Sequence, residues 1–167
     1  RFLEHVAGKK HPESPARLEA VWKGLDNLFL DEDLVRIAPR IATETELLRC
    51  HPIEHIRALE SLDAEGGGRM DPDTAISAGS WGAARLAAGS GLAAVEALTQ
   101  SEAETAFCAI RPPGHHATPD RSMGFCLINN IAVTAASLIA KGEKVAVIDI
   151  DAHHGNGTQE IFYFDPR

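Results

Sequence analysis

The stretch Val145-Ala146-Val147-Ile148-Asp149-Ile150 is a short apolar run of the kind that forms a buried strand. A second such run covers 106–110, and the pattern between the two runs predicts a helix at about 129–141. This order predicts a βαβ unit with parallel strands and a right-handed crossover. We therefore expect an α/β fold whose ligand crevice lies beyond the carboxyl ends of these strands.

Two helix starts precede this unit. Ser14 can cap a helix and Pro15 suits the first helical position, and apolar residues then recur at three- and four-residue steps. These features predict a helix from about 15 to 30. Further along, Thr43 and Glu46 form a capping-box pattern that predicts the start of a short helix.

The middle of the chain alternates helix and loop signals. One predicted helix presents the apolar face Ile53, Ile56, Leu59 and Leu62. The stretch 65–69 contains three glycines and is predicted to be a loop or an exposed insertion. Small residues at helical spacing then predict a closely packing helix at about 81–99.

Composition excludes several classes of protein. With 167 residues and 44% hydrophobic content the chain is long and apolar enough for one globular domain, and its formal net charge of −8 with scattered basic residues argues against direct nucleic-acid binding. No apolar run approaches the roughly 20 residues that span a bilayer. Three widely spaced cysteines, Cys50, Cys108 and Cys126, form neither a disulfide framework nor a CxxC zinc site. We expect a cytoplasmic protein without a membrane partner.

Two aspartates and a histidine that could bind a metal ion or a proton lie at the end of the second apolar run. If the strand continues through Asp149, Asp151 and His153, these side chains share one face. Burying two carboxylates without a cation is costly, whereas aspartate oxygen and histidine nitrogen suit zinc. Asp151 and His153 would then supply two of three zinc ligands. A strand end with exposed histidines is an equally good interpretation of this motif when it is taken alone.

A proline-rich turn follows the first apolar run. Arg111-Pro112-Pro113-Gly114 leads into His115 and His116, and a rigid turn presents adjacent imidazoles in a fixed geometry. A positioned pair of histidines can accept and return a proton near neutral pH. Asp149 and Asn156 are candidates to orient the two rings. Two such arrays at neighbouring strand ends favour a catalytic site over surface histidines.

A glycine and an aromatic residue lie between these motifs. Phe125, beside Gly124, could form the wall of a narrow channel that packs the alkyl stem of a substrate. Taken alone, a core phenylalanine is the better interpretation.

Together these segments resemble the histone deacetylase and acetylpolyamine amidohydrolase superfamily. The similarity lies in Arg111–His116, Gly124–Asn130 and Asp149–Gln159, and extends to His11–Leu18 and Asp71–Ser80. The resemblance implies a three-layer arginase/deacetylase-like α/β fold with a mostly parallel sheet. Because the first residue is Arg and not Met, we interpret 1–167 as the N-terminal part of a single deacetylase catalytic domain, truncated at both ends.

The resemblance also implies residue roles. Asp151 and His153 look like zinc ligands, and His115 and His116 look like tandem proton-handling histidines with Asp149 and Asn156 as partners. Many members carry Asp at the position of Asn156, and Asn there is similar to the class II-like and bacterial branch. An amide does not supply the negative charge of Asp, so His116 should be less easily protonated. Gly124 and Phe125 look like one side of an acyl-lysine channel.

Other sites are implied less completely. A monovalent cation site, for K⁺, would use Asp149, Asp151 and the His153 carbonyl. Either Asp71 or Asp73 corresponds to a rim aspartate that contacts the substrate backbone. The third zinc ligand and a transition-state tyrosine of the family fall beyond 167, and we expect these 167 residues alone to be inactive.

The implied activity is zinc-dependent hydrolysis of N-acetyl amides on lysine or polyamine-like amines. One alternative is an arginase-type ureohydrolase, which shares the fold and uses two manganese ions. Another is a non-catalytic metal- or acyl-binding module, if the native chain ends near Arg167. The sequence does not indicate an oligomeric state.

Overall fold

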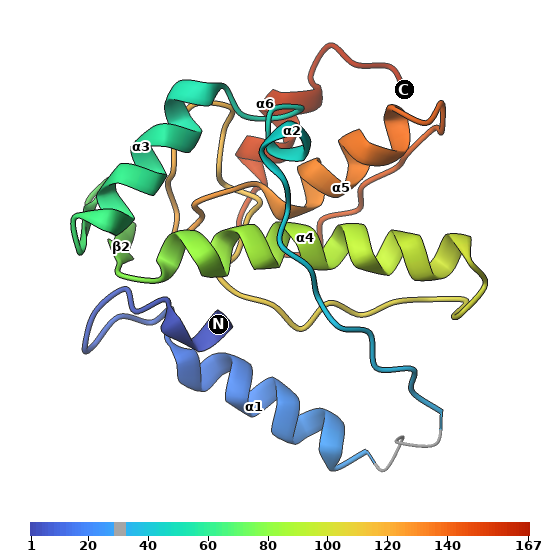
Figure 1. The fold of residues 1–167 in the computed structure, drawn as a ribbon, viewed down its shortest axis with the longest axis horizontal. Helices are drawn as coiled ribbons and strands as arrows, with labels where there is room; N and C mark the ends of the chain where they lie inside the picture. The colour runs from blue at the N-terminus through green and yellow to red at the C-terminus, as the bar shows by residue number, and fades with distance from the viewer. Residues whose placement is uncertain (29–32) are drawn as a thin grey trace.

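The computed structural model describes residues 1–28 and 33–167. Figure 1 shows short and long helices gathered around α4, with α1 below it in this view and α2, α3, α5 and α6 above it. The elements are η1 Phe2–Glu4, α1 Pro15–Asp26, α2 Glu44–Leu47, α3 Ile53–Ala64, β1 Gly67–Arg69, β2 Ala75–Ser77, α4 Ser80–Thr99, α5 Asn130–Ile139 and α6 Asn156–Phe162.

The centre of the fold is the packing of α4 against its neighbours. Two glycines in α4 allow the approach: a Cβ on Gly89 would lie 1.9 Å from the Arg40 carbonyl oxygen, and one on Gly91 would lie 2.0 Å from Thr134 Oγ1 on α5. Contacts this close leave no room for a side chain. The core around them is built from Ala42, Leu47, Ile56, Leu59, Ala84, Ala88, Leu92, Leu127, Ile128, Ala132 and Val133.

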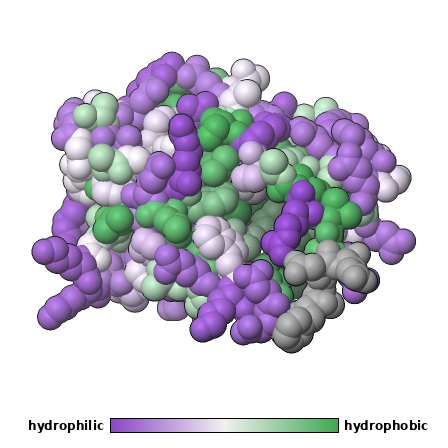
Figure 2. Space-filling model, turned by 60° about the horizontal axis from the view of Figure 1, so that its bottom comes forward, coloured by the Kyte–Doolittle hydropathy of each residue, from purple (hydrophilic) through white to green (hydrophobic). Residues whose placement is uncertain are grey.

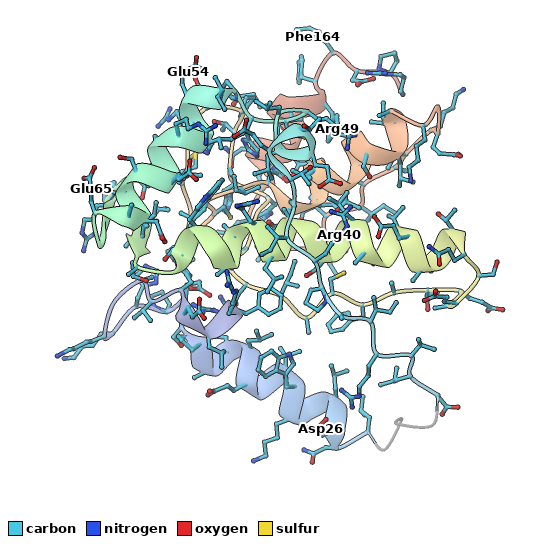
Figure 3. All side chains as sticks on the ribbon, in the orientation of Figure 1. Asp26, Arg40, Arg49, Glu54, Glu65 and Phe164 are labelled. Carbon is cyan, nitrogen blue, oxygen red and sulfur yellow. The ribbon has the colours of Figure 1, made fainter. Side chains whose placement is uncertain are left out.

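A charged cluster fastens the segment before α2 to α4. Arg40 lies where this segment crosses α4 (Figure 3), and its Nη2 is 2.7 Å from Glu46 Oε1 and 2.8 Å from Glu96 Oε1. The hydrogen bonds from Arg40 lower the pKa of Glu46 to about 2. The Glu46 carboxylate therefore stays ionised, and the guanidinium that binds both carboxylates holds the segment across the helix.

Most predicted helices are confirmed. The capping box is present, since Thr43 Oγ1 accepts from Glu46 N and the Glu46 side chain accepts from Thr43 N. Helix α3 covers the predicted apolar face, and α4 and α5 match the helices predicted at 81–99 and 129–141. The first helix starts at Pro15 as predicted, but the Ser14 hydroxyl makes no capping hydrogen bond. The predicted residues 29 and 30 lie outside the described ranges.

The prediction of a loop or an exposed insertion at 65–69 holds for 65 and 66, which form an exposed turn, but a loop is wrong for Gly67–Arg69. Gly67–Arg69 forms β1, which pairs antiparallel with β2, so that Gly67 lies opposite Ser77. Gly67 has φ +113°, and a Cβ there would lie 2.3 Å from the Ile76 carbonyl oxygen. Glycines are typical of loops, but here they permit a left-handed conformation and a close approach of two strands.

The prediction of parallel strands at 106–110 and 145–150 is also wrong in detail. Neither segment has regular secondary structure, and the β1–β2 ladder is the sheet found within 1–28 and 33–167. A strand needs a neighbour for its backbone hydrogen bonds, whereas both segments stay open to solvent. The exposed fraction is 73% for Phe107, 85% for Ile148 and 94% for Ile150. Figure 2 shows hydrophobic side chains in a hollow of the face that carries α1, and the 102–110 segment lines a groove there between α1 and α4.

In the part of the chain that the structure describes, no helix combines the length and apolar character needed to cross a membrane. The longest, α4, has 20 residues but is built largely of alanine and glycine. Helix α6 had no sequence prediction. It begins directly after the histidine-rich motif and takes part in the site described next.

Candidate active site

The turn that carries the tandem histidines is anchored by a buried ion pair. Arg111 donates from Nε to Glu13 Oε1 at 2.9 Å and from Nη2 to Glu13 Oε2 at 2.6 Å, and both side chains are buried. His5 Nε2 lies 3.3 Å from the same carboxylate. Burial raises the pKa of Glu13, but His5 and the Arg111 guanidinium lower it more, to about 2. The carboxylate thus stays ionised and fixes the start of the turn, where the Arg111–Pro112 peptide bond is cis.

Each tandem histidine binds an acceptor through Nδ1. His115 Nδ1 lies 2.9 Å from Asp149 Oδ2, and His116 Nδ1 lies 2.7 Å from Asn156 Oδ1. The hydrogen bond from His115 lowers the pKa of Asp149, so this carboxylate is ionised and can only accept. An amide oxygen also only accepts. Both Nδ1 atoms therefore carry the proton in the neutral rings, and each Nε2 keeps a lone pair that can take one.

The two rings lie close together, with centroids 4.0 Å apart and planes inclined by 44°. The His116 centroid is also 6.0 Å from that of His153. The structure therefore brings the predicted proton-handling pair next to a predicted metal ligand.

The start of α6 supports the histidine turn, and sequence reasoning missed this role. The backbone N–H groups of Gly157 and Thr158 donate to the His115 carbonyl at 3.0 and 3.2 Å. A Cβ on Gly155 would lie 2.2 Å from Asp149 Oδ2 and 3.3 Å from His115 Nδ1. Glycine is thus required beside this pair. The Gly-Asn-Gly sequence at 155–157 was the available signal for such a close backbone approach.

The segment 149–153 is not the strand face that was predicted. Asp151 N donates to Asp149 Oδ1 at 3.1 Å, and His153 N donates to Asp151 Oδ1 at 2.8 Å, so each aspartate binds the backbone two residues ahead. These local bonds replace a strand ladder. As a result, Asp149 turns to His115 while Asp151 contacts His153, and the three side chains do not form one wall.

Asp151 and His153 have the donor types and spacing of two zinc ligands. Asp151 Oδ1 and His153 Nδ1 are 3.0 Å apart, and two donors at bonds of about 2.0–2.1 Å on a tetrahedral zinc lie about 3.3 Å apart. The hydrogen bond from His153 N and the His153 side chain lower the pKa of Asp151. Within the described ranges no group of three His, Cys, Asp or Glu side chains could hold a metal ion. The residues present therefore fit zinc as two ligands of a larger set.

One of the two predicted channel residues lies against the histidine pair. Gly124 has φ +55°, and a Cβ on it would lie 2.4 Å from His116 Cδ2. Phe125 also has a positive φ, +70°, which is rare for an aromatic residue. Its ring is half-buried and meets that of His11 edge-on, with centroids 4.6 Å apart. The loop thus places Gly124 at His116 and the Phe125 ring at His11.

The two candidate rim aspartates differ in their contacts. Asp71 Oδ1 accepts from Asp73 N at 3.0 Å and from Thr74 N at 2.6 Å, so this carboxylate closes its own turn. Asp73 is exposed, and its Oδ1 accepts from the Thr74 hydroxyl at 3.1 Å. Asp73 therefore has the more accessible carboxylate.

The cysteines lie outside this chemistry. Burial raises the pKa of Cys50 and of Cys126 to about 12, and it raises the pKa of Cys108 as well. A thiol in this state is a poor nucleophile and a poor metal ligand at neutral pH.

Comparisons with known proteins find similar sequences. A family model described as "Histone deacetylase domain" matches residues 11–167. The chain is 42% identical to a "Probable deacetylase" of Archaeoglobus fulgidus, over 99% of this chain and 47% of that protein. It is 43% identical to the "Histone deacetylase-like amidohydrolase" of Pseudomonas aeruginosa, over 97% of this chain and 43% of that protein.

A solved structure is similar in fold. The crystal structure of the HDA15 HD domain superposes with a TM-score of 0.90 at 38% identity, over 96% of this chain and 48% of that chain. This likeness confirms the predicted arginase/deacetylase-like fold class, although the two strands predicted within it are not formed. The chain spans just under half the length of these three proteins.

Proposed function

Because this chain belongs to the histone deacetylase family, we propose that the protein containing it is a zinc-dependent deacetylase that hydrolyses N-acetyl amides of lysine or of polyamine-like amines. The observation that carries the proposal is the histidine pair. His115 and His116 both have Nδ1 bound to an acceptor, and their rings are 4.0 Å apart. This is the arrangement of a general base and acid that act on one reacting centre.

The pair handles the protons of hydrolysis. As the oxygen of a water molecule attacks the acetyl carbonyl carbon, an Nε2 lone pair takes the departing proton. The proton then goes to the amide nitrogen, the C–N bond breaks, and acetate and a free amine leave. Asp149 stabilises a charged His115 more than the neutral Asn156 stabilises a charged His116, so the two rings are not equivalent.

Asp151 and His153 would hold the zinc, since their donor atoms are 3.0 Å apart and of the types that zinc binds. When bound, zinc supplies Lewis-acid polarisation of the carbonyl and lowers the pKa of water. The monovalent cation site at Asp149, Asp151 and the His153 carbonyl stays a prediction.

The substrate stem would pass Phe125, whose half-buried ring follows Gly124, the residue that lies against His116. At the rim, exposed Asp73 is the better candidate to accept hydrogen bonds from the substrate, because the Asp71 carboxylate is engaged in its own turn. A long acyl-amine stem ending in a small acetyl group fits this arrangement.

The proposal is tested with the full-length, zinc-loaded protein and two acetylated amines, an acetyl-lysine peptide and a mono-acetylated diamine. Mass spectrometry follows the free amine and NMR follows the acetate. We expect equimolar acetate and amine from at least one substrate. Release of urea from arginine, without acetate from either amide, would instead support the ureohydrolase. No turnover of any of the three would support the binding module.

A further inference from the structure

Phe125 has a backbone conformation that aromatic residues rarely adopt. Gly124 and Phe125 both have positive φ, at +55° and +70°. The surrounding loop has one local pairing, in which Met123 and Cys126 exchange backbone hydrogen bonds of 3.1 and 2.9 Å. A left-handed aromatic residue persists only where its surroundings hold it. The contacts of Phe125 therefore decide where the channel wall stands.

The backbone of Phe125 is held by a residue 51 positions away. Phe125 N donates to Thr74 Oγ1 at 2.9 Å, and Thr74 is fully buried. The same hydroxyl donates to Asp73 Oδ1 at 3.1 Å, and Thr74 N donates to Asp71 Oδ1 at 2.6 Å. The hydroxyl thus accepts one bond and donates another. Serine can reproduce both bonds, whereas valine, of the same shape, can make neither.

The ring of Phe125 is held by the same loop through His11. The Glu13 N–H donates to His11 Nδ1 at 3.1 Å, so Nδ1 is an acceptor and the neutral ring carries its proton on Nε2. That Nε2–H donates to the Asp73 carbonyl at 2.9 Å. His11 is therefore fixed to the 71–74 turn while its ring meets Phe125 edge-on. The backbone and the ring of Phe125 are therefore both held by the 71–74 turn.

We propose that Thr74 is a positioning residue that sets the distance of the Phe125 ring from the histidine pair, and so selects the thickness of the alkyl stem that reaches it. The inference rests on the proposed deacetylase function. It follows because Gly124, the residue before Phe125, lies against His116, while Thr74 holds the backbone of Phe125 itself. A shift of the turn moves the wall without touching either histidine.

The test compares two peptide substrates in the full-length protein. One carries acetyl-lysine, and the other carries 4-(acetamidomethyl)phenylalanine at the same position, so that the reacting group is the same and the stem is a benzene ring. We expect Thr74→Val to raise KM for the acetyl-lysine peptide about tenfold, the loss expected when a buried N–H loses its acceptor, with kcat changed less than about threefold. The ratio of kcat/KM for the thin over the thick stem should fall by about fivefold or more.

Thr74→Ser should restore both KM and the ratio to within about twofold of the wild type, because it keeps the hydroxyl. Thr134→Val is the matched control. It removes a hydroxyl that donates only within α5, to the Asn130 carbonyl at 3.0 Å, and it should leave the ratio unchanged. If Thr74→Val does not fold, His11→Leu takes its place, because it removes the ring contact and the Asp73 bond while sparing Thr74. It should lower the same ratio.

Hydrolysis by the wild type with an unchanged ratio in Thr74→Val, or equal losses in the Val and Ser variants, would overturn the inference alone. A fall in kcat with KM and ratio unchanged would do so too. Absence of hydrolysis by the wild-type protein would overturn the proposed function, and this inference with it.

Discussion

The two halves of the candidate site are held in different ways. The histidine turn at 111–116 is fixed by partners far away in the sequence, from Glu13 at one end to Asn156 at the other. The segment 149–153 is held mainly by its own carboxylates, through bonds between residues two positions apart. Burial follows the same division, since the exposed fraction of the side chain is 17% for His115 but 79% for His153.

This difference matches the proposed roles of the two halves, which are to position the histidine pair and to bind the metal. A proton-handling pair has to be in place before the substrate arrives, because proton transfer requires hydrogen-bond geometry. Metal ligands held by local turns can adjust to the ion. We therefore expect substitutions in the distant anchors of the histidine turn to change folding and activity together. Substitutions in 149–153 should change metal binding and activity with little effect on folding.

The largest effect should come from the metal half. Asp151→Ala removes one of the two zinc-ligand candidates in this chain and should abolish zinc binding, with a loss in kcat/KM of about 10³-fold or more, because the metal supplies several kcal/mol of transition-state stabilisation. Zinc content by mass spectrometry and deacetylation rates check this. Asp26→Ala, an exposed aspartate on α1 paired with Arg36, is the control and should change neither. Full zinc content in Asp151→Ala would exclude Asp151 as a ligand.

The next effect should come from the distant anchor. Glu13→Gln leaves the buried Arg111 charge without its carboxylate and should lower the free energy of unfolding by about 3–5 kcal/mol. The pKa of Glu13 is lowered in the folded protein, so its stabilisation is complete above about pH 4.5 and is lost as the pH falls toward 2. Urea denaturation of the full-length protein measures both effects. An unchanged midpoint would show that the ion pair does not anchor the turn.

A smaller effect should appear in the pH dependence of folding. His51 is buried, accepts from Asn129 N at Nε2 and binds the Pro119 carbonyl through Nδ1, and burial lowers its pKa to about 4. The unfolded chain then binds a proton that the native state does not. Stability should be complete above about pH 6.5 and fall toward pH 4, by at most about 3 kcal/mol.

His51→Gln keeps a donor and an acceptor but cannot titrate in this range. The difference in unfolding free energy between variant and wild type should therefore change with pH between 6.5 and 4. A constant difference across that range would show that His51 titrates as in the unfolded chain.

The smallest effect should separate the two histidines. Asn156→Ala removes the acceptor of His116 Nδ1–H and should lower kcat about tenfold, whereas Asn156→Asp keeps an acceptor and adds a charge that stabilises a protonated ring. The pH–rate profile should move to higher pH in Asn156→Asp and not in Asn156→Ala. Coincident profiles for the two variants would show that the charge at this position does not reach His116.

The sequence predicted the site better than it predicted the sheet. The pairs of His115 with Asp149 and of His116 with Asn156 could be expected from short motifs that resemble those of a known family, and both pairs are present in the structure. The strands at 106–110 and 145–150 depend on neighbours that their own residues cannot specify. An apolar run shows that a segment can be buried, and it does not show what lies beside it.

Contacts between residues far apart in the sequence could not be predicted from it either. Glu13 and Arg111 are 98 positions apart, and Phe125 and Thr74 are 51 apart, so no periodicity links them. The turns at 149–153 were missed for a different reason. Alternating Asp-x-Asp-x-His fits a strand face, but aspartate can also bind the backbone two residues ahead, and that local bond prevails here.

Zinc-dependent hydrolysis should use the histidine pair beside Asp151 and His153. The most direct test removes metal from the full-length protein with a chelator and restores it stepwise while acetate release from an acetyl-lysine peptide is followed. We expect activity to disappear with the metal and to return in proportion to zinc, up to one zinc per chain. Acetate release that continues in the metal-free protein would contradict it.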